Sequence, residues 1–467
     1  MAAASASHPL LLLCLRVLCF ILLQVHPFAA AARTRTTTTA TGSVNRKAAS
    51  LILPLKTQQV AAGTLPRAGR PPNKLYFHHN ISLTVPLTVG SPPQNVSMVL
   101  DTGSELSWLR CDALTGAAPG APSFRPLASS SYAAIPCASA TCRDRTRDLA
   151  SPAFCNPANK LCGVSLSYAD GSAADGDLAS DIFRVGQSPP LRALFSCVGS
   201  PVSSSGEDAV TAGILGMNRG SLSFVSQMGA RRFSYCISDR DSTGVLLLGG
   251  DSAALPFPVP LNYTPLIQIS LPLPYFDRVA YSVQLEGIRV GSTLLPIPKS
   301  VLVPDHTGAG QTMVDSGSQF TFLLGPVYTV LKNEFLRQTR GALSQLGEPE
   351  FAFQGAFDTC FRVPRARPSP ASAGSLPAVV LMFRGGAAVP VSGDRLLYQA
   401  PGEVRGGGAD AVWCLTFGNS DLVPMEAYVI GHHHQQNVWV EYDLERSRVG
   451  FAPVRCDLAS QRLGALH

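Results

Sequence analysis

The chain has 467 residues, which is long enough for two domains with sizeable cores. Only 15% of the residues are charged, whereas Gly (41) and Pro (37) are abundant. Short apolar runs broken by turn residues predict an all-β architecture. The net charge of +6 comes from residues 1–75, which hold nine Lys or Arg and no acidic residue. The rest of the chain has 28 basic and 31 acidic residues, and this balance argues against a nucleic-acid-binding role.

The N-terminal segment is predicted to be a signal peptide over residues 1–32. Residues 10–25 are apolar except for Arg16 and Gln24, and the small residues 29–32 follow them. The run is short of the roughly 20 apolar residues of a membrane span. The Thr-rich, acid-free stretch after Arg33 leaves a plastid transit peptide as the alternative. The C-terminus has neither a hydrophobic anchor tail nor an endoplasmic-reticulum retention tetrapeptide, so no stable membrane anchor is expected.

Residues 33–75 contain eight Lys or Arg and are predicted to be a propeptide. In that interpretation they lie over an anionic cleft, and residues 51–55 supply one strand. The alternative is a flexible cationic linker.

The cysteines and sequons agree with secretion. Ten cysteines remain after the signal peptide, an even number that indicates disulfides, and no Cys-x-x-Cys pair suggests a zinc site. Glycosylation sequons begin at Asn80, Asn95 and Asn262.

Strand patterns continue along the chain. Residues 81–85 alternate with period two, residues 90–94 form a turn signal, and residues 95–100 run as a strand into Asp101. Further strands are expected at 244–250, 281–290, 311–314, 438–442 and 448–451, with a helix at 326–340 that begins with Pro and ends before Gly341. The stretch 255–260 is expected to pass between two lobes, and 364–375 is expected to be an exposed loop.

One segment occurs twice. Residues 99–109, which contain Asp101-Thr102-Gly103-Ser104, return as residues 313–323, which contain Asp315-Ser316-Gly317-Ser318. A second element repeats at the same spacing: Gly216 ends an apolar-apolar-Gly triplet 115 positions after Asp101, and Gly431 ends another 116 positions after Asp315. Two copies of one structural unit are therefore predicted, each delivering one carboxylate.

Two such carboxylates predict a catalytic dyad. A close pair cannot ionise fully, so it shares one proton. The ionised partner acts as general base on a water, and the protonated partner polarises a carbonyl. Gly103 and Gly317 allow tight turns whose amides point at the carboxylates, and the hydroxyls of Ser104 and Ser318 donate to the outer oxygens. Thr102 and Ser316 complete the support of the dyad.

With these motifs the chain resembles the pepsin-like (A1-type) plant aspartic proteases of the nepenthesin-like group, and most of all their promotion-of-cell-survival type. The resemblance covers about 76–457 and includes residues 90–94, 233–236, 413–415 and 435–443. It implies an all-β bilobal fold of two related β-barrel-like lobes with a few short helices, at 76–256 and 257–467. It also implies an endopeptidase without a cofactor or metal, which acts as a monomer on polypeptides and has its own propeptide as a partner. An acidic optimum is expected because the dyad needs one proton. The implied location is the secretory pathway, in the apoplast or endoplasmic reticulum, with vacuole or plastid as alternatives.

The resemblance also assigns individual residues. Tyr168, with Asp170 and Gly171, corresponds to the flap hairpin that closes over substrate, and Trp108 corresponds to the tryptophan that bonds the flap tyrosine. The implied disulfides are Cys111–Cys197, Cys137–Cys162, Cys142–Cys155, Cys236–Cys456 and Cys360–Cys414.

Two features depart from the simplest pattern. Glu105 adds a carboxylate four residues after Asp101 and is expected to be solvated, or else to shift the pH optimum. The triplet His432–His434 is expected to be structural or at the surface, because consecutive residues on a strand face opposite ways and do not converge on a metal. The competing function is a catalytically silent binding protein of the xylanase-inhibitor kind. Such proteins typically have a damaged dyad or flap, whereas here both are intact.

Overall fold

A computed structural model describes residues 50–60, 80–112, 121–186, 188–202, 206–239, 243–250, 252–366, 374 and 376–465. The predicted signal peptide, most of the predicted propeptide and much of the predicted loop 364–375 lie outside these residues. In the part of the chain that is described, no helix combines the length and apolar character that a bilayer crossing requires.

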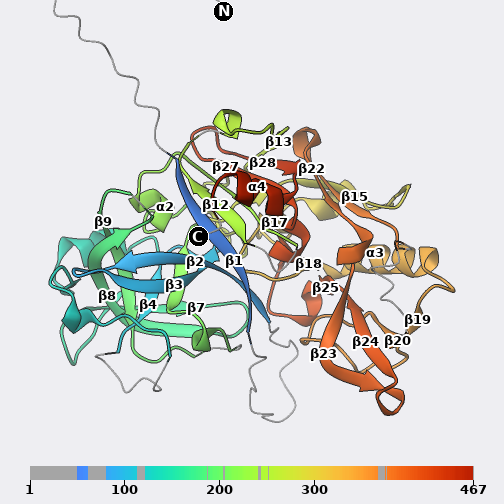
Figure 1. Ribbon diagram of the computed structural model, residues 1–467, viewed down its shortest axis with the longest axis horizontal. Helices are drawn as coiled ribbons and strands as arrows, with labels where there is room; N and C mark the ends of the chain where they lie inside the picture. The colour runs from blue at the N-terminus through green and yellow to red at the C-terminus, as the bar shows by residue number, and fades with distance from the viewer. Residues whose placement is uncertain are drawn as a thin grey trace, which may run out of the picture. The chain divides into compact units, whose positions relative to one another are not determined.

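Both halves of the chain contribute to one 15-stranded sheet (Figure 1). Strand β2 shows why these segments pair: its side chains Leu83, Val85, Leu87 and Val89 alternate along it and are all buried. Across the sheet the strands are β13 (Asn262–Pro265), β28 (Arg448–Pro453), β27 (Val438–Asp443), β11 (Arg232–Cys236), β12 (Gly244–Leu248), β1 (Leu51–Gln59), β2 (Ile81–Val89), β3 (Gln94–Asp101), β10 (Gly213–Gly216), β4 (Trp108–Arg110), β9 (Leu191–Val198), β8 (Ala173–Arg184), β7 (Cys162–Ser167) and β6 (Phe154–Cys155), and β5 (Ala133–Ala134) pairs with β8.

Strand β1 corrects one expectation about the N-terminal extension. The strand predicted at residues 51–55 is present, but its predicted place over a cleft is wrong, because β1 is an inner strand of the sheet. It pairs with β12 from Leu51 to Leu55 and with β2 from Lys56 to Gln59. Figure 1 shows this blue strand running beside β12. Leu53 and Leu55 are buried, so the strand contributes to the core and fills the gap between two neighbours that otherwise have unpaired edges.

The remaining strands form three smaller sheets from the second half of the chain. The first joins β14 (Ser282–Val283), β17 (Gln311–Val314), β26 (Ala427–Ile430), β18 (Thr321–Leu323) and β25 (Phe417–Asn419). The second joins β16 (Thr293–Leu294), β15 (Leu285–Val290), β21 (Val379–Phe383) and β22 (Ala388–Val391), and the third joins β19 (Ser344–Gln345), β20 (Cys360–Pro364), β24 (Asp410–Leu415) and β23 (Leu397–Arg405).

The α-helices among the described residues are α2 (Phe224–Gln227), α3 (Gly325–Gln338) and α4 (Cys456–Arg462), and α3 is the longest of them. Helix α3 confirms the predicted helix at 326–340. It has Pro in its first turn, and it buries Val327, Leu331 and Phe335, which recur every four residues on one face.

Five disulfides join the ten cysteines. Three pairs, Cys111–Cys197, Cys236–Cys456 and Cys360–Cys414, are those that the resemblance implies. The nested pairs Cys137–Cys162 and Cys142–Cys155 are wrong, because the structure joins Cys137 to Cys155 and Cys142 to Cys162.

Burial explains the exchanged partners. Cys155 and Cys162 lie opposite each other on β6 and β7. Cys142 and Cys162 are both buried in one apolar cluster with Leu106, whereas Cys155 is exposed and Cys137 half-buried. The inner cysteines therefore pair with each other, and so do the outer ones.

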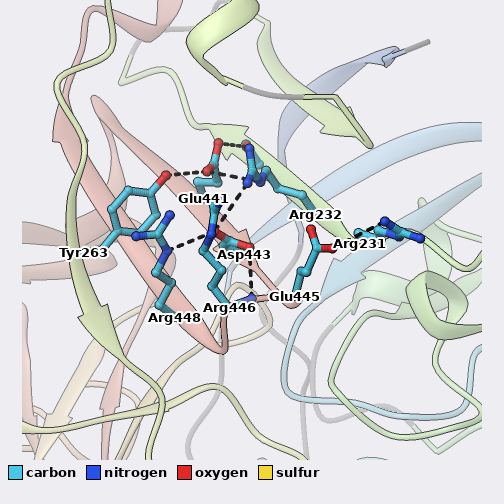
Figure 2. A network of polar contacts seen from close by, with 9 residues as sticks. Arg231, Arg232, Tyr263, Glu441, Asp443, Glu445, Arg446 and Arg448 are labelled. Atoms are coloured by element: carbon cyan, nitrogen blue, oxygen red, sulfur yellow. Dashed lines mark hydrogen bonds and ion pairs between the residues drawn. The ribbon is translucent and has the colours of Figure 1, made fainter. Parts of the chain in front are cut away.

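A buried ion-pair network joins the two halves of the chain near the end of the large sheet (Figure 2). Arg232 on β11 contacts Glu441 and Asp443 on β27 at 3.5 and 3.4 Å, and both carboxylate side chains are fully buried. Arg448 on β28 bonds Asp443 at 2.9 Å, and the Tyr263 hydroxyl donates to Glu441 at 2.6 Å. Because every buried charge has a partner, removing one member is expected to destabilise the fold by about 3–5 kcal/mol.

Candidate active site

The two Asp loops follow two parallel strand pairs of the same construction. Strand β3 pairs with β10 so that Asp101 lies opposite Gly216, and β17 pairs with β26 so that Val314 lies opposite Ile430. The next strand of each copy then returns antiparallel: Trp108 is opposite Ile214, and Phe322 is opposite Val429. The repeat of the two motifs at one spacing is therefore a repeat of strand register.

Each carboxylate is held by the turn that follows it. The Gly103 amide donates to Asp101 Oδ1 at 2.8 Å, and the Gly317 amide donates to Asp315 Oδ1 at 2.9 Å. The Ser104 hydroxyl donates to Asp101 Oδ2, and the Ser318 hydroxyl donates to Asp315 Oδ2 at 2.7 Å. Every bond stabilises the ionised carboxylate and fixes its orientation.

The residues that follow the two aspartates tie the loops to each other. The Thr102 amide donates to Ser316 Oγ at 3.0 Å, and the Ser316 amide donates to Thr102 Oγ1 at 2.9 Å. The Ser316 hydroxyl also donates to the Leu100 carbonyl at 2.8 Å. Since both side chains are buried, this exchange sets the separation of the carboxylates rigidly.

The two carboxylates meet closely, and only glycine fits between them. A Cβ atom on Gly317 would lie 2.3 Å from Asp101 Oδ1, and one on Gly103 would lie 3.0 Å from Asp315 Oδ1. Burial, followed by the charge of Asp315, raises the pKa of Asp101 to about 7. The pair therefore retains one proton through the acidic range.

The dyad lies in a cleft of about 800 Å³ that the predicted flap lines. The flap is a hairpin in which β7 and β8 pair up to Ser167 and Ala173, and Gly171 has a φ of 85° at its turn. Asp170 supports the turn by accepting from the Ser172 amide at 2.9 Å. The Trp108 indole donates to Tyr168 Oη at 2.8 Å, so the structure brings the predicted flap and dyad residues together.

Glu105 is not simply solvated as expected. Its side chain is half-buried, and its Oε1 accepts from the Leu222 amide at 3.0 Å. Burial raises its pKa, and Asp277 and Asp148 act in the same direction. Glu105 therefore supports the turn around Leu222 at the edge of the cleft.

The histidine triplet lies on a 3-10 turn (His432–Gln435), not on a strand, so the strand-based argument was wrong. All three side chains are buried. His433 Nε2 contacts the Arg395 carbonyl at 3.1 Å, and the ring of His434 contacts Thr416 Oγ1 at 2.8 Å and Thr321 Oγ1 at 2.7 Å. Burial lowers the pKa of His433 to about 4. These contacts make the triplet a structural support beneath the second Asp loop.

The three sequons differ in exposure. Asn95 and Asn262 are exposed, whereas Asn80 is half-buried and its Nδ2 donates to Tyr398 Oη at 2.9 Å. A glycan would attach to that nitrogen, and the Asn80 sequon stays a prediction.

Two residues that sequence reasoning missed support the site. Gln435 Nε2 donates to the Asp315 carbonyl at 3.0 Å and to the Ile430 carbonyl at 2.7 Å. Glu207 lines the cleft, and its charge adds to the elevation of the Asp101 pKa after burial and Asp315. Gln435 is the first residue of the stretch 435–443, which carries part of the family resemblance, so the sequence offered a signal for it. Nothing in the sequence around Glu207 marks that residue as part of the site.

Comparison with known proteins identifies the family of the chain. Residues 84–250 match the family Xylanase inhibitor N-terminal, and residues 280–453 match Xylanase inhibitor C-terminal. The chain is 58% identical over 416 residues to Aspartic proteinase PCS1 of Arabidopsis thaliana, across 89% of each chain. It belongs to the plant pepsin-like aspartic proteinases. Aspartic proteinase nepenthesin-2 of Nepenthes gracilis is a more distant relative of this aspartic endopeptidase, 31% identical over 79% of this chain and 77% of that one.

Solved structures agree on the bilobal pepsin-like fold. The chain matches the crystal structure of edgp with a TM-score of 0.59 and 20% identity, covering 88% of this chain and 96% of that one. It matches Basic 7S globulin from soybean with a TM-score of 0.56 and 21% identity, covering 86% and 96%. At these identities the likeness concerns the fold alone.

Proposed function

We propose that Asp101 and Asp315 together hydrolyse peptide bonds of polypeptides bound in the cleft. The carrying observation is the closely packed carboxylate pair, with each member held by a glycine amide and a serine hydroxyl. The ionised carboxylate takes a proton from a water, whose oxygen bonds to the peptide carbonyl carbon. The protonated carboxylate gives its proton to the carbonyl oxygen, which forms a tetrahedral diol. The carboxylate that took the water proton then gives it to the nitrogen, while the other carboxylate takes a proton from a diol hydroxyl. The C–N bond breaks, which releases an amine and a carboxylic acid and restores the dyad with its one proton.

The flap completes this assembly. Tyr168 and Trp108 form one hydrogen-bonded unit on the Asp101 side of the cleft. We propose that the hairpin closes over bound substrate and excludes water other than the nucleophile. Because the dyad needs one proton, activity is highest at acidic pH, and it falls as the pH rises through the raised pKa of Asp101.

The test is a cleavage assay between pH 3 and pH 7 with a denatured protein as the substrate. The enzyme is the mature protein, produced by expressing the full-length chain and allowing it to be processed. The wild type is expected to cleave internal bonds at acidic pH, and Asp101→Asn is expected to lose this activity while it keeps the wild-type circular dichroism spectrum. Glu445→Gln removes a carboxylate whose side chain is 56% exposed and is the matched control, with wild-type activity expected. Undiminished cleavage by folded Asp101→Asn would falsify the mechanism.

The second candidate is a silent binding protein, since the matched family descriptions name xylanase inhibitors. The intact dyad and the Trp108–Tyr168 pair favour the enzyme. The same assay separates the two, because a silent binder cleaves nothing at any pH.

We also propose that the protein enters the secretory pathway through a signal peptide at 1–32, matures by removal of residues within 33–75, and acts as a monomer. Its destination is the apoplast or the endoplasmic reticulum. Five disulfides support an oxidising compartment. Since β1 lies inside the sheet, N-terminal sequencing of the mature protein tests whether residues 51–59 are retained. Glycosidase treatment of secreted protein is expected to remove glycans from Asn95 and Asn262, and it also tests the Asn80 sequon.

A further inference from the structure

The walls of the cleft are strongly acidic. Apart from the dyad, its charged lining consists of six carboxylates and a single guanidinium, that of Arg278. The carboxylates belong to Glu105, Asp148, Asp170, Glu207, Asp277 and Glu426. A cleft lined by one sign of charge concentrates ligands of the opposite sign, and its low-dielectric walls strengthen each contact. Burial raises the pKa of Glu105 and of Asp277, so these two add less negative charge at acidic pH than the other four. The cleft still favours cationic polypeptides over anionic ones, because Arg278 is its one cationic lining residue.

Three of these carboxylates are engaged by the backbone of neighbouring turns. Glu105 accepts from the Leu222 amide at 3.0 Å, Asp170 from the Ser172 amide at 2.9 Å, and Asp277 from the Val279 amide at 2.8 Å. Their first role is to hold the loops at the rim of the cleft.

Glu207 is placed differently. It lies on the 3-10 turn Gly206–Ala209, between β9 and β10, and the hydroxyl of Ser82 on β2 donates to its Oε1. The Thr211 amide and hydroxyl donate to the Glu207 carbonyl at 3.0 and 3.1 Å, which fixes the backbone of the turn. The side chain of Glu207 is half-buried and lines the cleft. Its carboxylate is oriented by the hydroxyl of Ser82 on β2.

The charge of Glu207 also acts at the dyad. Burial and Asp315 contribute most to the raised pKa of Asp101, and Glu207 acts in the same direction. Glu207 and Asp101 line the same cleft, and the contribution of Glu207 is the smallest of those named. A cationic substrate group that pairs with Glu207 therefore lies in the cleft that holds the dyad.

We propose that Glu207 is a specificity-determining residue that binds a Lys or Arg side chain of the substrate close to the scissile bond. This inference rests on the proposed function, since it concerns the substrate of the same dyad. The aliphatic stem of Lys or Arg extends along the apolar part of the cleft, and its charged end reaches the oriented carboxylate. Closure of the flap removes water from this ion pair and strengthens it.

The test compares peptides that differ at one position. A cleavable neutral peptide is varied at each of the three residues on either side of the scissile bond, with Lys, norleucine or Glu at that position. Norleucine keeps the stem of Lys and lacks its charge. For the wild type at acidic pH, kcat/KM is expected to be at least 10-fold higher with Lys than with norleucine at one of these positions, and lowest with Glu.

Variants then assign the preference to Glu207. In Glu207→Gln the Lys-to-norleucine ratio of kcat/KM is expected to fall to about 1, and Glu207→Lys is expected to reverse the preference toward Glu. Glu445→Gln, which removes the same charge outside the cleft lining, keeps the wild-type ratio. If Glu207→Gln does not fold, as judged by circular dichroism, Ser82→Ala serves instead, because it removes the hydroxyl that orients Glu207 and is expected to lower the ratio at least 3-fold.

The outcomes distinguish the role of Glu207 from the proteolytic function. A wild type that cleaves the norleucine peptide as fast as the Lys peptide overturns the role of Glu207 and leaves the proteolytic function standing. So does a Lys preference that survives in folded Glu207→Gln. A wild type that cleaves no peptide of any series at any pH overturns the proposed function, and this inference with it.

Discussion

The two Asp loops have one construction and different surroundings. Both hold the carboxylate with a glycine amide and a serine hydroxyl, and both return through an antiparallel strand in the same register. Four residues after the aspartate, the first copy has Glu105 and the second has Gln319. Seven residues after the aspartate, the first copy has Trp108 and the second has Phe322. Trp108 bonds the flap tyrosine, whereas Phe322 is buried and its ring lies 5.6 Å from that of Phe357.

This difference separates catalysis from support. The chemistry needs two equivalent carboxylates, so the residues that touch them are the same in both copies. In the proposed mechanism substrate closure needs one flap, and only the first copy carries a residue that bonds Tyr168. The second copy instead rests on the buried turn His432–Gln435, whose Gln435 donates to the Asp315 carbonyl. Duplication of the loop thus left each copy free to acquire a different second role.

The largest expected effect tests whether the two aspartates are equivalent. Asp101→Asn and Asp315→Asn are each expected to lower kcat/KM at least about 1,000-fold, because either change removes one partner of the shared proton. Both proteins are expected to fold, since an amide also accepts from the glycine amide. Peptide hydrolysis and thermal unfolding measure the two properties. A loss confined to one variant would break the equivalence.

The next effect tests whether Trp108 and Phe322, each seven residues after its aspartate, have different roles. Trp108→Phe gives the first copy the residue of the second and removes the 2.8 Å bond to Tyr168, so kcat/KM is expected to fall about 5- to 10-fold. Phe322→Leu is the counterpart in the second copy and is expected to lower the free energy of unfolding by about 1–2 kcal/mol, with kcat/KM nearly unchanged. Kinetics and urea unfolding of both variants distinguish an active-site role from a packing role.

The third effect concerns the buried support of the second copy at acidic pH. The pKa of His433 is about 4 in the folded protein and about 6.5 in an unfolded chain. Below pH 6.5 the unfolded chain therefore binds a proton that folded His433 does not, and the free energy of unfolding is expected to drop by about 3 kcal/mol between pH 6.5 and pH 4. The Arg395 carbonyl and the rings of Phe320, Tyr398 and His434 face His433. After burial, the charge of Arg395 also lowers the His433 pKa, and the charge of Asp394 opposes it.

The non-titrating variant His433→Asn is expected to lose this part of the pH dependence. The difference between variant and wild type isolates His433, because the raised pKa of Asp101 acts in the opposite direction and is common to both. Urea unfolding at several pH values is the measurement. Equal slopes in the two proteins would assign the acid sensitivity to other groups.

The smallest effect concerns Glu105, which lies four residues after Asp101, where the second copy has Gln319. Glu105→Gln introduces the residue of the second copy, and its amide oxygen still accepts from the Leu222 amide. The raised pKa of Glu105 means that the folded state favours the protonated form, so ionisation above the usual carboxyl pKa weakens the fold. The variant is therefore expected to be more stable at pH 7 by less than about 1 kcal/mol and unchanged near pH 3. Thermal unfolding at the two pH values tests this.

Local patterns predicted the parts of the site that one strand and one turn specify. The hydrogen bonds of Gly103 and Ser104 to Asp101 follow from residues within three positions of one another. The helix at Gly325–Gln338 follows in the same way from its N-terminal Pro and its apolar period. Contacts between segments far apart in the sequence were harder to predict. The two exchanged disulfides depended on which cysteines are buried against Leu106, and spacing does not encode this burial.

The sequence by itself determined the dyad, because a repeated motif at matched spacing encodes a repeated strand register, and register decides where each carboxylate emerges. Only the tertiary structure decided that β1 is an inner strand, that His433 is buried without its charge, and that Ser82 orients Glu207 in the cleft. Each of these depends on segments tens to hundreds of residues apart. Burial and the dielectric environment that result from such packing exist only once the chain has folded.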